Sequence, residues 1–351
     1  MGRRNWFILP AVAVARLHSS TTLHHERSEI PPGAANREDS GRHDPLLHTL
    51  RRRMLNRLRV WRERGWTEID AAAYAAAWQR CGGSVFTHPL VVERLSALAG
   101  IPVRYLGYFS GEQLLAAIPC WGRYLALSKE VLKKRGQRGL FDLGNAEVIL
   151  PIDAQARVPV RQRMRYLSEL NAGRISQLKA QPEGLALARA PEDYSKKFRY
   201  NQRRERRLLE EAGGQVRQML DFSPREQASM YADLFRRRWG FAARGHAHLA
   251  EVFALLREFM TGAILFRQEQ PIAVQILYRV EAPAWISLEY INGGVDPETR
   301  DFSPGSVLSF INTQNAWADA RALGKPLRFS FGRADREYKD RWCHRVPAYR
   351  I

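Results

Sequence analysis

Residues 263–277, AILFRQEQPIAVQIL, place a polar turn between two apolar runs, a pattern that predicts a β-hairpin. The alternating apolar residues of 285–291 predict a third strand. A long helix is expected over 306–323, followed by another strand over 327–331 and a last one over 346–351. Three strands, a helix, a strand, a helix or loop and a final strand indicate an α/β fold with mixed sheets flanked by helices.

The hairpin is preceded by two helical segments, 224–239 and 248–260. The same plan occurs earlier in the chain. Helical patterns over 70–78 and 90–98 precede YLGYFSGEQLLAAIP, residues 105–119, which is again an apolar run, a polar turn and an apolar run. We therefore expect a structural duplication, although hairpins after helices are common enough to arise by chance.

The composition favours a globular protein with anionic partners. The 351 residues are enough for two cores, and 55 Lys and Arg against 36 acidic residues give a net charge of +19. This excess favours nucleic acid, phospholipid headgroups, lipopolysaccharide phosphates or a phosphorylated cofactor without choosing among them. The three scattered cysteines frame neither disulfides nor a metal cluster, which favours a reducing compartment and predicts no metal.

Residues 1–53 differ from the rest of the chain. They lack periodicity and are rich in Arg, His, Ser and Pro, which predicts a disordered tail or an over-extended start. A secretory signal over residues 6–15 is the alternative, although Pro10 interrupts its apolar run. We expect the domains to span 54–190 and 191–351.

Several stretches carry a family resemblance. Residues 194–216, YSKKFRYNQRRERRLLEEAGGQV, and 301–324, DFSPGSVLSFINTQNAWADARALG, resemble the start and end of FemAB-like domains in the GNAT superfamily of acyl-CoA N-acyltransferases. Residues 77–89, AWQRCGGSVFTHP, and 331–347, FGRADREYKDRWCHRVP, resemble the Mig-14 family, and this resemblance covers 54–351.

The resemblance implies tandem GNAT-like domains. It also implies a bacterial protein at the inner-membrane surface that contributes to resistance against cationic antimicrobial peptides. The expected activity is acyl or aminoacyl transfer from acyl-CoA or another activated donor. The alternative is a non-catalytic scaffold that binds anionic envelope components or nucleic acid. The expected location is cytoplasmic, with peripheral attachment to the inner membrane.

The donor site is expected where the loop DFSPGS enters the long helix. Ser303, Gly305, Ser306 and Val307 are the candidate cofactor-binding residues, because helix N-termini bind phosphates through backbone N–H groups. Only one glycine of the usual GNAT phosphate-binding signature is present. Ordinary helix capping by the same serines therefore stays an alternative.

The densest basic run supplies candidate anion-binding residues. Lys196, Arg199, Arg203 and Arg207 would form one stripe on a helix, and the two later arginines could bind phosphates in bidentate fashion. A solvated helix face is the alternative. The signals of sequence-specific nucleic-acid recognition are missing from the run, so a nucleic-acid partner is not expected.

Tyr338 and Glu289 are the candidate catalytic residues. The tyrosine could protonate a leaving thiolate, and the glutamate could act as general base for an amine. Lys339 is a further anion-binding candidate. The alternatives are a salt-bridged turn around 335–340 and a solvent-facing carboxylate at Glu289. His88 is interpreted as a helix-start residue, after a Thr87 N-cap, rather than as a base.

Overall fold

The computed structural model describes residues 59–351, which belong to one compact unit. The tail expected over 1–53 and the signal considered within it lie outside the described residues. The domain boundary at 190/191 stays a prediction.

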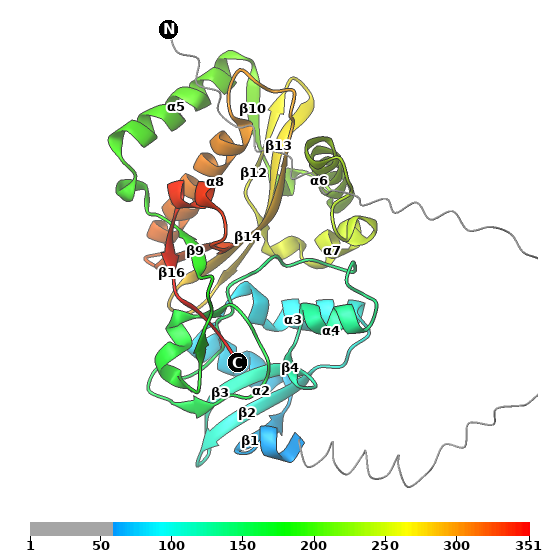
Figure 1. Ribbon diagram of the computed structural model, residues 1–351, viewed down its shortest axis with the longest axis vertical. Coiled ribbons are helices and arrows are strands. Elements are labelled where there is room, and N and C mark those ends of the chain that lie inside the picture. The colour runs from blue at the N-terminus through cyan, green and yellow to red at the C-terminus, as the bar shows by residue number, and fades with distance from the viewer. Residues whose placement is uncertain (1–58) are drawn as a thin grey trace, which may run out of the picture. The chain divides into compact units, whose positions relative to one another are not determined.

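An eight-stranded mixed sheet forms the centre of the C-terminal half (Figure 1). Seven of its strands follow one another in space as β10 (Gly214–Gln218), β12 (Ala263–Arg267), β13 (Gln270–Glu281), β14 (Ile286–Val295), β15 (Leu327–Arg333), β9 (Leu185–Ala188) and β16 (Cys343–Val346), while β11 (Met260–Thr261) pairs with β13. The β14–β15 pair is parallel and the other pairs are antiparallel. The predicted order of strands and helix is confirmed.

Helices cover both faces of this sheet (Figure 1). On one face lie α5 (Lys196–Glu211) and α8 (Pro304–Ala322), and on the other lie α6 (Pro224–Trp239) and α7 (Leu249–Leu255). The ends of α6 follow from its sequence: a Ser223–Glu226 capping box starts the helix, and Gly240 ends it in the left-handed region. The helix expected over 248–260 is shorter, because it ends at Leu255 and a 3₁₀ turn follows.

The N-terminal half begins with a four-stranded sheet and several helices (Figure 1). Its elements are β1 (Trp66–Ile69), α2 (Ala71–Cys81), α3 (Pro89–Leu98), β2 (Arg104–Ser110), β3 (Gln113–Trp121), β4 (Tyr124–Leu125) and α4 (Lys129–Lys134). Two helices followed by an antiparallel hairpin therefore occur in both halves, as the sequence predicts. The chain is a mixed α/β protein.

Each half contributes a strand to a sheet of the other half. The last predicted strand is in fact two, β16 in the large sheet and β17 (Ala348–Arg350), which pairs with β6 (Leu167–Ser168) and β8 (Lys179–Ala180) in a small sheet. In the other direction, β9 enters the large sheet between β15 and β16. A separate two-stranded sheet pairs β5 (Val158–Pro159) with β7 (Ile175–Ser176).

The halves also share one hydrophobic cluster, in which Trp78 and Val92 of the first half join Phe253 and Tyr278 of the second. Polar contacts add to it: the Val85 N–H donates to Ser287 Oγ at 3.3 Å. The surface along which the two sequence halves touch is therefore buried from solvent.

The start of α3 differs from the expected Thr87 cap. His88 is the N-cap residue, and Thr87 Oγ1 instead accepts from Ser84 N and donates to the Ile149 carbonyl at 2.7 Å. The His88 ring packs edge-on against Trp78 and Phe259, and this burial lowers its pKa to about 4. His88 is thus a helix-start residue, as interpreted.

Candidate donor and anion site

The four predicted donor-site residues lie at the start of α8. Pro304 is the first helical residue, and the Ser303 side chain makes no capping bond to a backbone N–H. Its hydroxyl donates to Ser306 Oγ at 3.1 Å, while the N–H groups of Ser306 and Val307 both donate to the Ser303 carbonyl at 3.0 Å. The Val307 side chain is buried in the core. Of the four predicted residues, Ser303, Gly305 and Ser306 therefore remain partly exposed, and Val307 presents neither side chain nor N–H.

The glycine in this turn has a packing role. A Cβ at Gly305 would lie 3.1 Å from Val295 Cγ1 at the end of β14, a contact that would require a small shift. Gly305 therefore lets the helix start close against the strand, in addition to presenting a bare backbone N–H. This close approach fixes the position of the α8 N-terminus relative to the sheet.

The structure brings this turn and the cationic helix together. Glu205 of α5 accepts a hydrogen bond from the Ser303 N–H at 2.8 Å. A carboxylate here is favoured by the positive end of the α8 dipole. An internal anion thus already lies where a phosphate was expected, while α5 runs alongside the start of α8 (Figure 1).

The predicted stripe on α5 is largely preserved. Ser195 caps the helix by accepting from the Phe198 N–H at 3.1 Å, and Gln202 and Leu209 face inward. The stripe residues Lys196, Arg203 and Arg207 are exposed. The fourth, Arg199, is half-buried and donates to the carbonyl oxygens of Pro191 and Glu192 at 3.2 and 3.1 Å. Three cations are therefore available to an anionic ligand.

Lys339 does not join this stripe. Its ammonium is buried and donates to the carbonyls of Phe331 and Arg333 at 2.9 and 2.7 Å, with the Asp335 carboxylate at 3.5 Å. Burial lowers the Lys339 pKa, against the opposing charge of Asp335. Its donors hold the end of β15, so the alternative of a salt-bridged turn describes it better than phosphate binding.

Tyr338 has the exposure that a proton donor needs. It lies in a 3₁₀ turn after β15, and the residue is 44% exposed. Desolvation of its hydroxyl raises its pKa, so the hydroxyl remains protonated at neutral pH. Nearby, Tyr290 stacks on Phe331 with ring centroids 5.2 Å apart. The turn can therefore present one phenolic proton to a ligand near the end of β15.

Glu289 is neither solvent-facing nor accessible to a substrate. It is 0% exposed on β14, and its Oε1 accepts from the Glu147 N–H at 3.1 Å. Glu147 is itself buried and forms an ion pair with Arg328 of β15, whose Nε lies 3.0 Å from Glu147 Oε2. Desolvation, followed by the charge of Glu147, raises the Glu289 pKa well above its usual value. Burial thus favours the neutral form of Glu289, which lies in a buried network between the halves.

Sequence reasoning missed three charged residues. Glu147 and Arg328 stand within apolar runs, 146–150 and 327–331, and a charge in such a run is the signal that could have identified them. Glu205 carries no comparable signal, because a glutamate in a basic helix looks like any surface residue.

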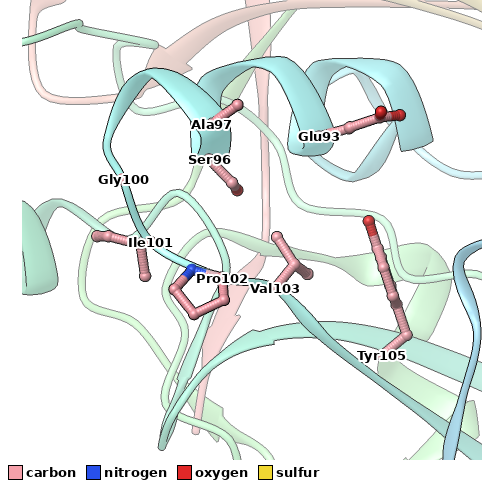
Figure 2. A pocket seen from close by; sticks show the side chains of 8 residues that line it. All are labelled: Glu93, Ser96, Ala97, Gly100, Ile101, Pro102, Val103 and Tyr105. Carbon is pink, nitrogen blue, oxygen red and sulfur yellow. The ribbon is translucent and has the colours of Figure 1, made fainter.

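Two cavities lie apart from the predicted residues. One, of about 340 Å³, is a shallow groove between the end of α3 and the start of β2, with Ser96, Ile101, Val103 and Tyr105 around it (Figure 2). The other, of about 260 Å³, lies between α8 and the large sheet. Neither is lined by a predicted site residue.

Residues 59–351 contain no group of three or more His, Cys, Asp or Glu residues placed to hold a metal ion. Across the same residues, every helix is too short or too polar to cross a bilayer.

Comparisons with known proteins extend these observations. The structural match to FemX covers 96% of FemX and 81% of this chain, at 11% identity and a TM-score of 0.46. The match to L-PGS from Bacillus licheniformis covers 91% of that protein and 81% of this chain, at 14% identity and a TM-score of 0.40. The match to a tandem GNAT protein from the clavulanic acid biosynthesis pathway covers 96% of that protein and 81% of this chain, at 8% identity and a TM-score of 0.39. At TM-scores below 0.5 these likenesses say nothing about activity.

No curated protein matches the chain. A family model described as Mig-14 matches residues 88–351, three quarters of the chain.

Proposed function

We propose, from the premise that this chain belongs to the Mig-14 family, that it transfers an acyl or aminoacyl group from a phosphate-bearing donor. The donor is acyl-CoA or another activated acyl or aminoacyl carrier. The observation that carries the proposal is the row of exposed cations on α5, Lys196, Arg203 and Arg207, beside the N-terminus of α8. A row of exposed cations beside a helix N-terminus is a favourable place for phosphates.

Each part of this site has a role in the proposed reaction. Arg203, Arg207 and Lys196 bind the donor's phosphates, and the backbone at Gly305 approaches them closely. The acceptor's amine nitrogen attacks the donor's carbonyl carbon, the bond from that carbon to the leaving sulfur or oxygen breaks, and Tyr338 protonates the leaving atom. The amine proton passes to solvent, and the tyrosinate then regains a proton from water.

A second candidate function is a non-catalytic scaffold for anionic envelope components. Two observations favour it: Glu205 already occupies the α8 N-terminus, and Glu289 is out of a substrate's reach. The end of α6 also exposes arginines beside Trp239 and Phe241, which are 45% and 60% exposed. Arginine with exposed aromatics suits an anionic membrane surface. Under either function we propose peripheral attachment to the inner membrane and a contribution to cationic-peptide resistance.

The deciding experiment measures binding of acyl-CoA, aminoacyl-tRNA and anionic vesicles to the full chain. The variant Arg203→Gln/Arg207→Gln should weaken phosphate-ligand binding and flatten its salt dependence, while the melting temperature stays nearly unchanged. The matched control is Arg135→Gln/Arg138→Gln, which removes the same charge from exposed positions after α4.

A second variant separates the two functions. Gly305→Ala should weaken CoA binding and leave vesicle binding intact. If neither CoA nor aminoacyl-tRNA binds while vesicle binding depends on Arg203 and Arg207, the transferase is refuted and the scaffold stands. If no ligand responds to either change, both proposals fail.

A further inference from the structure

The cavity under α8 has polar walls and an apolar floor. Its floor includes Leu277 of β13 and Leu288 of β14, and its walls include Thr261, Arg279, Asn315 and Asp319. From Gly305 to Asp319 the helix rises about 21 Å, at 1.5 Å per residue. The cavity is therefore separate from the proposed donor site.

The cavity's wall toward α8 is rigidly built. Buried Asn312 donates to Gln275 Oε1 at 2.8 Å and accepts from the Ala263 N–H at 2.9 Å. Gln275 in turn donates to Ser309 Oγ at 2.8 Å. Gly262 has φ +94°, and a Cβ there would lie 2.8 Å from a methyl carbon of Leu277, so only glycine fits. Fixed hydrogen bonds and a required glycine indicate a preformed hollow.

One charge at this cavity is locally unfavourable. Asp319 lies in the last turn of α8, where the negative end of the helix dipole disfavours a carboxylate. Its side chain has no ion pair within residues 59–351. Asp319 is solvent-exposed, so its carboxylate is free to accept hydrogen bonds from a cationic ligand.

The opposite charge lies across the cavity. Arg279, on β13, makes only a long contact of 3.4 Å with Glu281 Oε2, so most of its donors are available. An acid and a guanidinium on different walls, above an apolar floor, match a small molecule with an ammonium, a carboxylate and an aliphatic group. The volume of about 260 Å³ suits a small molecule of this kind rather than a drug-sized or polymeric ligand.

We propose that this cavity binds a free aliphatic α-amino acid. Asp319 accepts from its ammonium, Arg279 donates to its carboxylate, and the side chain lies on Leu277 and Leu288. This site goes beyond the proposed transferase function and does not depend on it.

The test is calorimetric titration of the full chain with L-leucine, leucinamide and N-acetyl-leucine, each at up to about 10 mM, which covers a millimolar Kd. L-leucine should bind, and each analogue, lacking one charge, should bind at least about tenfold more weakly. Absence of L-leucine binding, or equal binding of all three compounds, overturns the proposal.

Two variants assign the charges. Asp319→Asn should weaken L-leucine binding at least about tenfold but leave the weaker binding of N-acetyl-leucine unchanged, because that analogue has no ammonium. Arg279→Gln should also weaken L-leucine binding at least about tenfold, but it should leave the weaker binding of leucinamide unchanged, because that analogue has no carboxylate. The control is Glu112→Gln in the exposed β2–β3 turn. If both variants retain the wild-type melting temperature and bind L-leucine normally, the assignment is wrong.

Discussion

Replacing Glu289 with glutamine tests the buried network between the halves. The carboxyl is fully buried, and desolvation together with the charge of Glu147 raises its pKa well above 4.5. Its neutral, protonated form is therefore favoured in the folded protein. Glutamine has the same shape, is neutral at every pH and can still accept the 3.1 Å hydrogen bond from the Glu147 N–H.

The sign of the pH effect follows from proton binding. Above pH 4.5 the unfolded chain loses this proton and the folded chain keeps it, so the wild-type protein loses stability as pH rises. The loss is about 1.4 kcal/mol for each pH unit until the folded pKa is reached. Glu289→Gln lacks this dependence. Its unfolding free energy minus that of the wild type should rise by up to about 3 kcal/mol between pH 5 and pH 7.

Urea unfolding followed by tryptophan fluorescence at pH 5, 6 and 7 measures this difference. Glu112→Gln, which changes an exposed carboxylate, is the control and should show a difference that does not vary with pH. If the Glu289→Gln difference is also flat, Glu289 is ionised in the folded protein and the description of the network is wrong.

Three further predictions concern other residues. Arg328→Gln leaves buried Glu147 without its counter-charge and should lower the unfolding free energy by about 3–5 kcal/mol in urea; a loss below about 1 kcal/mol would contradict a buried ion pair. Glu205→Gln removes the internal anion at Ser303 and should tighten CoA binding in calorimetry, whereas unchanged affinity would mean that the donor does not bind at the α8 N-terminus. The wild type should lose stability as pH falls from 6.5 toward 4, because His88 gains a proton in the unfolded chain but not in the folded one, where its pKa is about 4. The variant His88→Phe should reduce this loss in pH-dependent thermal melts. An identical loss in the variant would show that His88 is not the group responsible.

The order of elements could be predicted because it is written in local patterns. Alternation in β14 and β15, helical periodicity in α8, and the Ser223 and Gly240 signals at the ends of α6 each need only neighbouring residues.

The surroundings of single side chains could not be predicted in this way. Alternation in β14 places Ile286, Leu288 and Tyr290 on one face and assigns Glu289 to the other, which the sequence suggests is solvent. That other face is covered by residues around Ser84 and Glu147, far away in the sequence. Lys339 looked available for the same reason, because its carbonyl partners are visible only after the chain has folded around it.

The position of β9 has a consequence for how the protein is made. This strand leaves the ribosome long before β15 and β16, yet it lies between them in the finished sheet. Until the last residues emerge, both of its edges lack their partners, and unpaired edges invite aggregation. Such non-local pairing slows folding. A chain that stops before Cys343 would leave one edge of β9 permanently open, so loss of a few C-terminal residues should harm yield more than their number suggests.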